Sequence, residues 1–154
     1  MASSRVSLSK ALKLKNRQIQ RVKDLQQRIQ SSNSFLEGSE PDFDANELFS
    51  QLLDATERLW LIKAAINAAN SPIQGTIYEL AECKGLVAFL KGLNTQRGLQ
   101  MMAYMATQPQ EYESQITAQD AHQKIDELEK RIDELQDKLD AFNATTTVDV
   151  DVAD

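Results

Sequence analysis

The chain has 154 residues, of which 42% are hydrophobic and 26% are charged, and its 23 acidic residues against 17 lysines and arginines give a net charge of -6. Five glycines and three prolines interrupt it, and its commonest residues favour helix. The single cysteine excludes an internal disulfide framework and a multi-cysteine zinc site. No apolar run reaches the roughly 18 residues of a membrane span, and no apolar signal-peptide core is found. We therefore expect a protein in a reducing, cytoplasmic setting.

Charge is unevenly distributed along the chain. Residues 1–23 carry seven bases and no acid, whereas residues 118–154 carry eleven acids and four bases. Segments of opposite charge predict pairing, within one subunit or between two. A transit peptide, a membrane-surface helix and a nucleic-acid-binding helix are alternatives for the basic segment. No aromatic residue lies between the bases, as a base-stacking surface would need, so we expect no nucleic-acid partner.

Residues 1–6 are expected to be frayed, and Ser7 is predicted to cap a first helix that ends near Ser31. The apolar side of this helix consists of Leu8, Leu12, Ile19, Val22, Leu25 and Ile29. Residues 31–43 are rich in Ser and also hold Asn, Gly and Pro, which predicts a linker. Its length allows the next helix to return antiparallel to the first.

The segment from Asp44 to Asn70 carries the most regular pattern of the chain. Apolar residues recur in steps of three and four, which predicts one continuous stripe on a helix. This stripe consists of Leu48, Leu52, Ala55, Leu59, Ile62, Ile66 and Ala69. Phe49, Leu53 and Trp60 lie outside it, so the helix is expected to contact more than one neighbour. Arg58 and Lys63 flank the stripe, either as ligand-binding cations or as side chains that end in salt bridges.

Ser71 and Pro72 predict the start of a third helix, which ends near Leu93. Its apolar residues are Ile73, Ile77, Leu80, Leu86, Val87, Phe89, Leu90 and Leu93. Within it, Glu79, Glu82 and Lys84 form the most site-like group of the sequence. A lysine held by carboxylates could act as a base or bind a small molecule or metal; a structural salt bridge between helices is the simpler interpretation.

Residues 98–117 predict a short β-hairpin. The residues Gln108, Pro109 and Gln110 indicate a turn, and the flanking segments alternate in polarity as strands do. The alternating positions are Met102, Tyr104 and Ala106 before the turn, and Tyr112, Ser114 and Ile116 after it.

The next segment predicts a fourth helix, with Thr117 and Asp120 as a capping box. Its stripe consists of Ala121, Ile125, Leu128, Ile132, Leu135, Leu139 and Phe142. Lys124 and Glu129 flank this stripe with opposite charges, as in a coiled coil. Residues 144–154 then form either an acidic tail or a terminal strand, in which Val148, Val150 and Val152 alternate with acids and which could add to the edge of the hairpin.

No other constellation indicates chemistry. His122 is the only histidine, and no nucleophile accompanies it as a Ser-His-acid site would require. Cys83 lies among apolar residues, where inert thiols are common. The residues near Asp149 match a calcium loop poorly, because the central Gly and terminal Glu are missing. We therefore predict no enzymatic activity and no cofactor or metal.

Three passages resemble a known family: LSKALKLKNRQIQRVKDLQQRI near the start, IYELAECKGLVAFLKGLNT in the middle and IDELQDKLDAFNATT near the end. They are similar to small bacterial proteins labelled septicolysin, whose function is unknown. The resemblance implies a mostly helical fold that self-assembles. The label itself implies a cytolysin, which the absence of an export signal and of span-forming segments does not support.

Together these patterns predict a mainly α protein of four long helical segments in an elongated antiparallel bundle or coiled-coil arrangement. Residues 1–143 are expected to form one helical domain, with the hairpin at 98–117. Stripes this wide leave apolar surface uncovered in a monomer, so the predicted partner is a second copy of the chain. The predicted packing and self-association residues are Leu48, Leu52, Leu59, Ile62, Ile66, Ile125, Leu128, Ile132, Leu135 and Leu139. The alternative functions are a membrane-surface protein acting through its first helix, and a small-molecule or metal binder using Glu79, Glu82 and Lys84.

Overall fold

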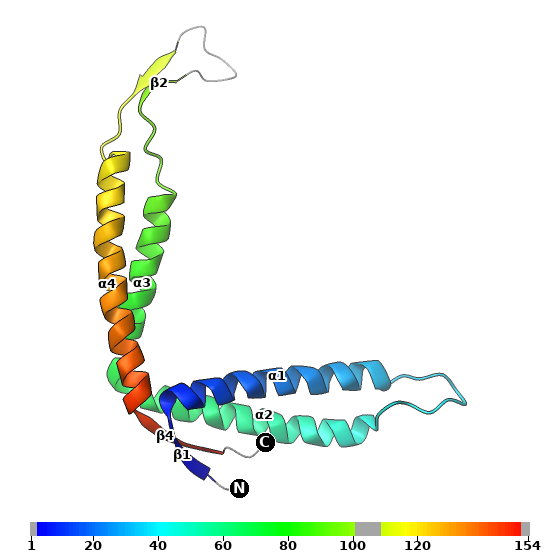
Figure 1. Cartoon of the computed structure of the whole chain (residues 1–154). Helices are drawn as coiled ribbons and strands as arrows, with labels where there is room; N and C mark the ends of the chain where they lie inside the picture. The colour runs from blue at the N-terminus through cyan, green and yellow to red at the C-terminus, as the bar shows by residue number, and fades with distance from the viewer. Residues whose placement is uncertain (1–2, 101–108, 152–154) are drawn as a thin grey trace. The chain divides into compact units, whose positions relative to one another are not determined.

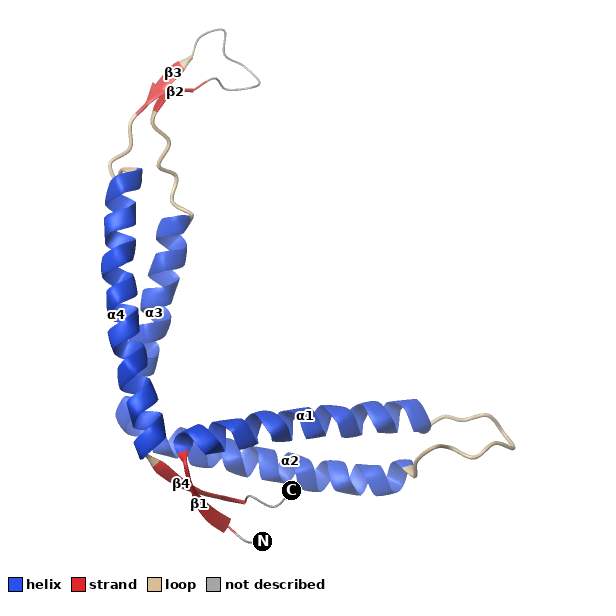
Figure 2. Ribbon diagram, viewed as in Figure 1, coloured by secondary structure: helices blue, strands red, loops and turns tan. Residues whose placement is uncertain are grey.

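The computed structural model describes residues 3–100 and 109–151, and this part of the chain is mainly α-helical, as predicted (Figures 1 and 2). The helices are α1 (Leu8–Ser32), α2 (Ala45–Ala69), α3 (Gln74–Lys91) and α4 (Ala118–Thr145), with one 3-10 turn, η1, at Ser71–Ile73. The strands are β1 (Ser3–Ser7), β2 (Gly98–Gln100), β3 (Gln110–Tyr112) and β4 (Thr147–Asp151).

The chain divides into two compact units. The first comprises Met1–Ile73 and Asp140–Asp154, and the second comprises Gln74–Leu139. The first unit contains α1, α2, η1, β1, β4 and the last residues of α4. The second contains α3, β2, β3 and the rest of α4.

The predicted helix caps are present in the structure. The Ser7 hydroxyl accepts a hydrogen bond from the Lys10 backbone N–H at 3.2 Å. The Asp44 carboxylate accepts from the backbone N–H groups of Asn46 and Glu47 at 2.9 and 3.3 Å. Each cap satisfies donors that the first turn of a helix leaves without an intrahelical partner, so α1 and α2 begin where the sequence predicts.

Strands β1 and β4 form an antiparallel pair in which Val6 lies opposite Val148. The Leu8 N–H donates to the Thr146 carbonyl at 2.7 Å, which extends the pairing to the start of α1. The prediction that residues 1–6 are frayed is therefore wrong for residues 3–6. The partner of the terminal strand is β1 rather than the hairpin. Three consecutive threonines, at 145–147, favour this change from helix to strand because β-branched side chains fit a strand better.

Helices α1 and α2 lie side by side in the first unit and enclose two apolar clusters. One cluster joins the strand pair to the helices, and its buried members are Val6, Leu8, Ala11, Ile62, Ile66, Val148 and Val150. The other lies farther along the helix pair and is built on Leu25, Leu48 and Ala55. Val148 and Val150 are buried and Asp149 between them is exposed, so β4 has one apolar face and covers α2 with it.

In the second unit, α3 and α4 pack through a cluster of Leu80, Cys83 and Leu135, with Leu128, Ile132 and Leu139 partly buried around it. The capping box predicted for α4 is confirmed. The Asp120 carboxylate accepts from the Thr117 N–H at 3.0 Å, and the Thr117 hydroxyl accepts from the Asp120 N–H at 3.1 Å. These reciprocal bonds fix the first turn of α4.

Strands β2 and β3 pair antiparallel between α3 and α4, which confirms a small β element there. The pair is shorter than predicted: Tyr112 belongs to β3, but Ser114 and Ile116 lie outside any strand. The predicted strand positions Met102, Tyr104 and Ala106 lie outside the described residues. Gly98 begins β2 with a φ of 83°, a conformation that glycine adopts at little cost.

Candidate functional site

The stripe predicted on α2 packs against other parts of its own unit. Leu48, Ile62 and Ile66 are buried, and Leu52 and Leu59 are half-buried. Leu48 and Leu52 belong to the cluster with Leu25 of α1, and Ile62 and Ile66 belong to the cluster with the strand pair. These four side chains are therefore packed within the chain, and we look for a surface for self-association elsewhere on the helix.

The stripe predicted on α4 is also turned inward. Ile125 and Leu135 are buried, and Leu128, Ile132 and Leu139 are half-buried. Of these, Leu128, Ile132, Leu135 and Leu139 contact the cluster around Leu80 of α3. The α4 stripe thus serves to hold the second unit together.

A second apolar face lies on the outside of α2. Phe49, Leu53, Trp60 and Leu61 are large hydrophobic residues with exposed side chains, and Trp60 is 59% exposed. Phe49, Leu53 and Trp60 are spaced by four and seven residues, which places them on one face of the helix. This set, called here the outer face of α2, matches the expectation from the sequence that the helix has apolar residues beyond its main stripe.

Helix α3 has an outer apolar face as well. Tyr78, Leu86 and Phe89 are exposed, Tyr78 and Phe89 at 64% and 61%. Their spacing of eight and three residues puts them on one side of the helix, away from the buried Leu80, Cys83 and Val87. Helices with apolar residues on opposite sides are typical of positions between two layers of structure.

The group Glu79, Glu82 and Lys84 is not brought together in the structure. Glu79 pairs with Arg131 of α4, whose Nη2 lies 2.7 Å from the carboxylate. The hydrogen bonds from Arg131 to Glu79 and then to Glu134 raise the pKa of Arg131 above its ordinary value. Glu82 and Lys84 are exposed. Lys84 lies two positions from Glu82 and five from Glu79, so it is not on the helix face that the two glutamates share, and the arrangement is a salt bridge between helices rather than a binding site.

The remaining candidates for chemistry lie apart from one another. His122 is exposed, and Cys83 is a buried free thiol in the core of the second unit. Asp149 lies in β4, a paired strand rather than a calcium loop. Within residues 3–100 and 109–151, no group of three or more His, Cys, Asp or Glu side chains is placed to hold a metal ion.

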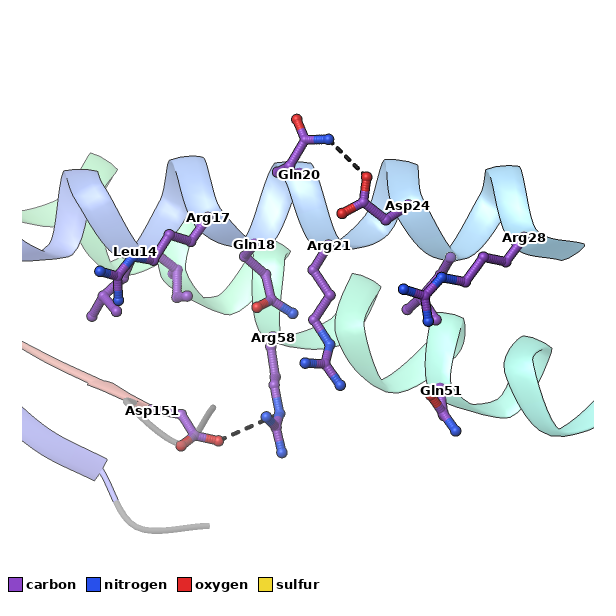
Figure 3. A pocket seen from close by; sticks show the side chains of 12 residues that line it. Leu14, Arg17, Gln18, Gln20, Arg21, Asp24, Arg28, Gln51, Arg58 and Asp151 are labelled. Carbon is purple, nitrogen blue, oxygen red and sulfur yellow. Dashed lines mark hydrogen bonds and ion pairs between the residues drawn. The ribbon is translucent and has the colours of Figure 1, made fainter. Parts of the chain in front are cut away.

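A cleft lies between α1 and α2, with Asp151 of β4 in its lining (Figure 3). Its volume is about 460 Å³, and its lining includes four arginines: Arg17, Arg21, Arg28 and Arg58. Arg58 contacts Asp151 of β4, with Nε and Oδ2 3.7 Å apart. The sequence indicated the basic character of residues 1–23 and singled out Arg58, but it did not show that they would share one cleft. The spacing of Arg17, Arg21 and Arg28, by four and seven residues, was the available signal.

Among the helices that the structure describes, none combines the length and the apolar character needed to cross a membrane.

Comparison with known proteins places the chain in a family. Residues 15–148 match the family of unknown function DUF6847, and because this match spans most of the chain, the protein belongs to that family. The prediction of a family without known function is thus confirmed, whereas nothing in the comparisons supports the septicolysin label.

One solved structure resembles this fold over nearly the whole chain. It is the crystal structure of a functionally unknown conserved protein from Corynebacterium diphtheriae, with a TM-score of 0.74 and 17% sequence identity. The match covers 94% of this chain and 99% of that one. At 17% sequence identity, the similarity between the two structures shows that they share a fold and nothing about function. No curated protein matches the sequence.

Proposed function

We propose that this protein is a non-enzymatic, self-assembling structural protein, whose partner is a second copy of the same chain. The observation that carries the proposal is the pair of outer apolar faces, Phe49, Leu53 and Trp60 on α2 and Tyr78, Leu86 and Phe89 on α3. The opposite side of α2 packs against α1, and the opposite side of α3 packs against α4. A helix that is apolar on two sides needs a second layer of structure.

The size of these faces supports an interface. Three large side chains that are about half exposed present roughly 300 Å² of apolar surface on each helix, since an aromatic side chain buries 150–250 Å² when fully covered. Patches of this size are at the lower limit of those that mark interaction sites. A stable interface covers about 800 Å² per partner, so neighbouring polar residues would have to form its rim.

The alternatives from the sequence receive less support. A membrane-surface role for α1 would need its apolar side to be free, but Leu8, Ala11 and Leu25 on that side are buried. A binder built on Glu79, Glu82 and Lys84 would need the three side chains to converge, and Glu79 is engaged with Arg131. A cytoplasmic location is part of the proposal and accords with a buried, unbridged Cys83.

The test is the oligomeric state of the full chain, measured by sedimentation equilibrium at about 50 μM protein and again at about 1 μM. We expect an oligomer at the higher concentration. Trp60 is the only tryptophan and lies in the proposed interface, so its fluorescence emission should shift to shorter wavelength as the protein associates. Trp60→Glu should shift the protein to the monomer. Gln27→Glu, which adds the same charge at an exposed position on α1, should leave assembly unchanged.

Phe89→Glu tests the outer face of α3 separately. If it also yields monomer, both faces contribute; if only Trp60→Glu does so, the interface belongs to the first unit. A wild-type chain that is monomeric at about 50 μM would overturn the proposal.

A further inference from the structure

The cleft between α1 and α2 has the dimensions of a small-molecule site. Its volume of about 460 Å³ lies within the range of roughly 300–1,000 Å³ typical of ligand pockets. Its lining combines the apolar residues Leu14, Leu25 and Ile62 with polar and charged side chains. Figure 3 shows that the side chains of Arg21 and Gln18 extend from α1 toward α2, beside Arg58. The cleft lies entirely within the first unit.

The basic residues of the cleft are all arginines. Four of the seven arginines of the chain line it, and none of the ten lysines does. Arginine is the residue that recognises phosphate and carboxylate through two parallel hydrogen bonds, because its guanidinium is planar and always charged. On α1, Arg17, Arg21 and Arg28 follow one face over 11 residues, a distance of roughly 16 Å along the helix axis.

The charge of the cleft is not balanced by its own acids. Of the two acids in the lining, Asp151 pairs with Arg58, and Asp24 accepts a hydrogen bond from Gln20 at 2.8 Å. Arg28 lies over the ring of Phe43, 5.4 Å from its centroid. Within the described residues, Arg17 and Arg21 form no ion pair. Two adjacent arginines without carboxylate partners are notable in a chain that carries a net charge of -6.

We propose that this cleft binds a small anion that carries several phosphate groups. A row of guanidinium groups along one helix face suits successive charges on a chain of phosphates better than one compact anion. The side-chain amides of Gln18 and Gln51 add hydrogen-bonding groups to the same lining, and Gln18 is held in place by donating to the Ala55 carbonyl at 2.9 Å. No aromatic residue is in the lining, so recognition is of the phosphates rather than of a base.

This site is independent of the proposed self-assembly. Arg58 and Trp60 are two residues apart on α2 and therefore point to different sides of the helix. A variant that loses anion binding is expected to keep self-assembly, and a variant that loses self-assembly is expected to keep anion binding. Failure of one proposal is therefore distinguishable from failure of the other.

The test is calorimetric titration of the full chain with sodium tripolyphosphate at low ionic strength. We expect saturable binding that weakens as salt is added. The double variant Arg17→Gln and Arg21→Gln should raise Kd by about tenfold or more, because each lost charge-assisted hydrogen bond weakens affinity severalfold. The matched control, Lys13→Gln with Lys23→Gln, removes the same charge from exposed positions of α1 outside the cleft and should change Kd by no more than about twofold.

Several results would overturn the proposal. One is the absence of saturable binding, and another is an equal loss of affinity in the arginine and lysine double variants, which would indicate non-specific charge attraction. Citrate binding as tightly as tripolyphosphate would refute the preference for phosphate. Binding of single-stranded RNA or of anionic vesicles without any binding of tripolyphosphate would show that the arginines serve a macromolecular surface instead. Far-UV circular dichroism of both double variants checks that they are folded.

Discussion

The two units of this protein pack a pair of helices in different ways. In the first unit, small residues such as Ala11 and Ala55 lie in the seam between α1 and α2, and the backbones approach more closely than those of α3 and α4. In the second, Leu80 and Leu135 fill the seam and hold the backbones farther apart. The distance between packed helices depends on the side chains at their contact. In the first unit, helices and strands together surround the apolar clusters. In the second unit, the helices are held by one apolar cluster between α3 and α4.

The largest expected effect comes from Leu8→Ala. Leu8 is 0% exposed and lies where α1, α2 and the strand pair meet. Removing its side chain should lower the free energy of unfolding by about 3–5 kcal/mol, since the surrounding cluster cannot collapse into the space. Urea unfolding followed by circular dichroism measures this. Leu36→Ala, in the exposed loop after α1, is the control and should have almost no effect.

A smaller loss is expected from Leu135→Ala in the second unit. Leu135 is 2% exposed, but its neighbours Leu128, Ile132 and Leu139 are only half-buried. The cavity can therefore open toward water, and the expected loss is about 2 kcal/mol in the same urea measurement. If Leu135→Ala proved as costly as Leu8→Ala, the contrast between the two units would not hold.

A still smaller effect is expected from Glu79→Gln, which removes the ion pair with Arg131 and keeps the second ion pair between α3 and α4, Lys91 with Glu129. Because Glu79 and Arg131 are both about half exposed, water and salt screen their attraction. The melting temperature should fall slightly at low salt, and the difference from the wild type should disappear in about 1 M sodium chloride. Glu82→Gln removes a charge from an exposed position nearby without an ion pair in the described residues. An equal fall in that variant would assign the effect to net charge instead.

The smallest effect is expected from acidification at the start of α4. Hydrogen bonds from the Thr117 side chain, and then from its backbone, lower the pKa of Asp120 below its ordinary value of 3.8. A carboxylate whose pKa is lowered by folding stabilises the protein above its ordinary pKa, and this stabilisation is lost as the pH falls through the lowered value. The melting temperature of the wild type minus that of Asp120→Ala should therefore be constant near neutral pH and decline below pH 3.8. A difference that is unchanged down to about pH 2 would contradict this account.

Features that depend on local spacing were predictable from the sequence. The caps at Ser7, Asp44 and Thr117 and the four helices follow from residues within a few positions of each other. The exposed second face of α2 was also visible, because Phe49, Leu53 and Trp60 depart from the main stripe.

Features that join distant residues were not predictable in the same way. The partner of β4 is β1, whose paired residues are at least 140 positions away, and no local pattern identifies one edge strand as the partner of another. The cleft has the same origin, because Arg17, Arg21 and Arg58 line one cleft only through the pairing of α1 with α2. For the group Glu79, Glu82 and Lys84 the simpler interpretation, a salt bridge between helices, holds at Glu79, although the sequence did not identify Arg131 as its partner.

The pairing of Ser3–Ser7 with Thr147–Asp151 has a consequence for synthesis on the ribosome. Val148 and Val150 are synthesised long after Ile62 and Ile66, yet they pack against these two side chains. Residues Gln74–Leu139 of the second unit are made before β4, so until then part of the apolar surface of α2 stays uncovered. Until β4 has been made, Ile62 and Ile66 lack part of the apolar contact that buries them, so the first unit can close only after the residues of the second unit have been synthesised.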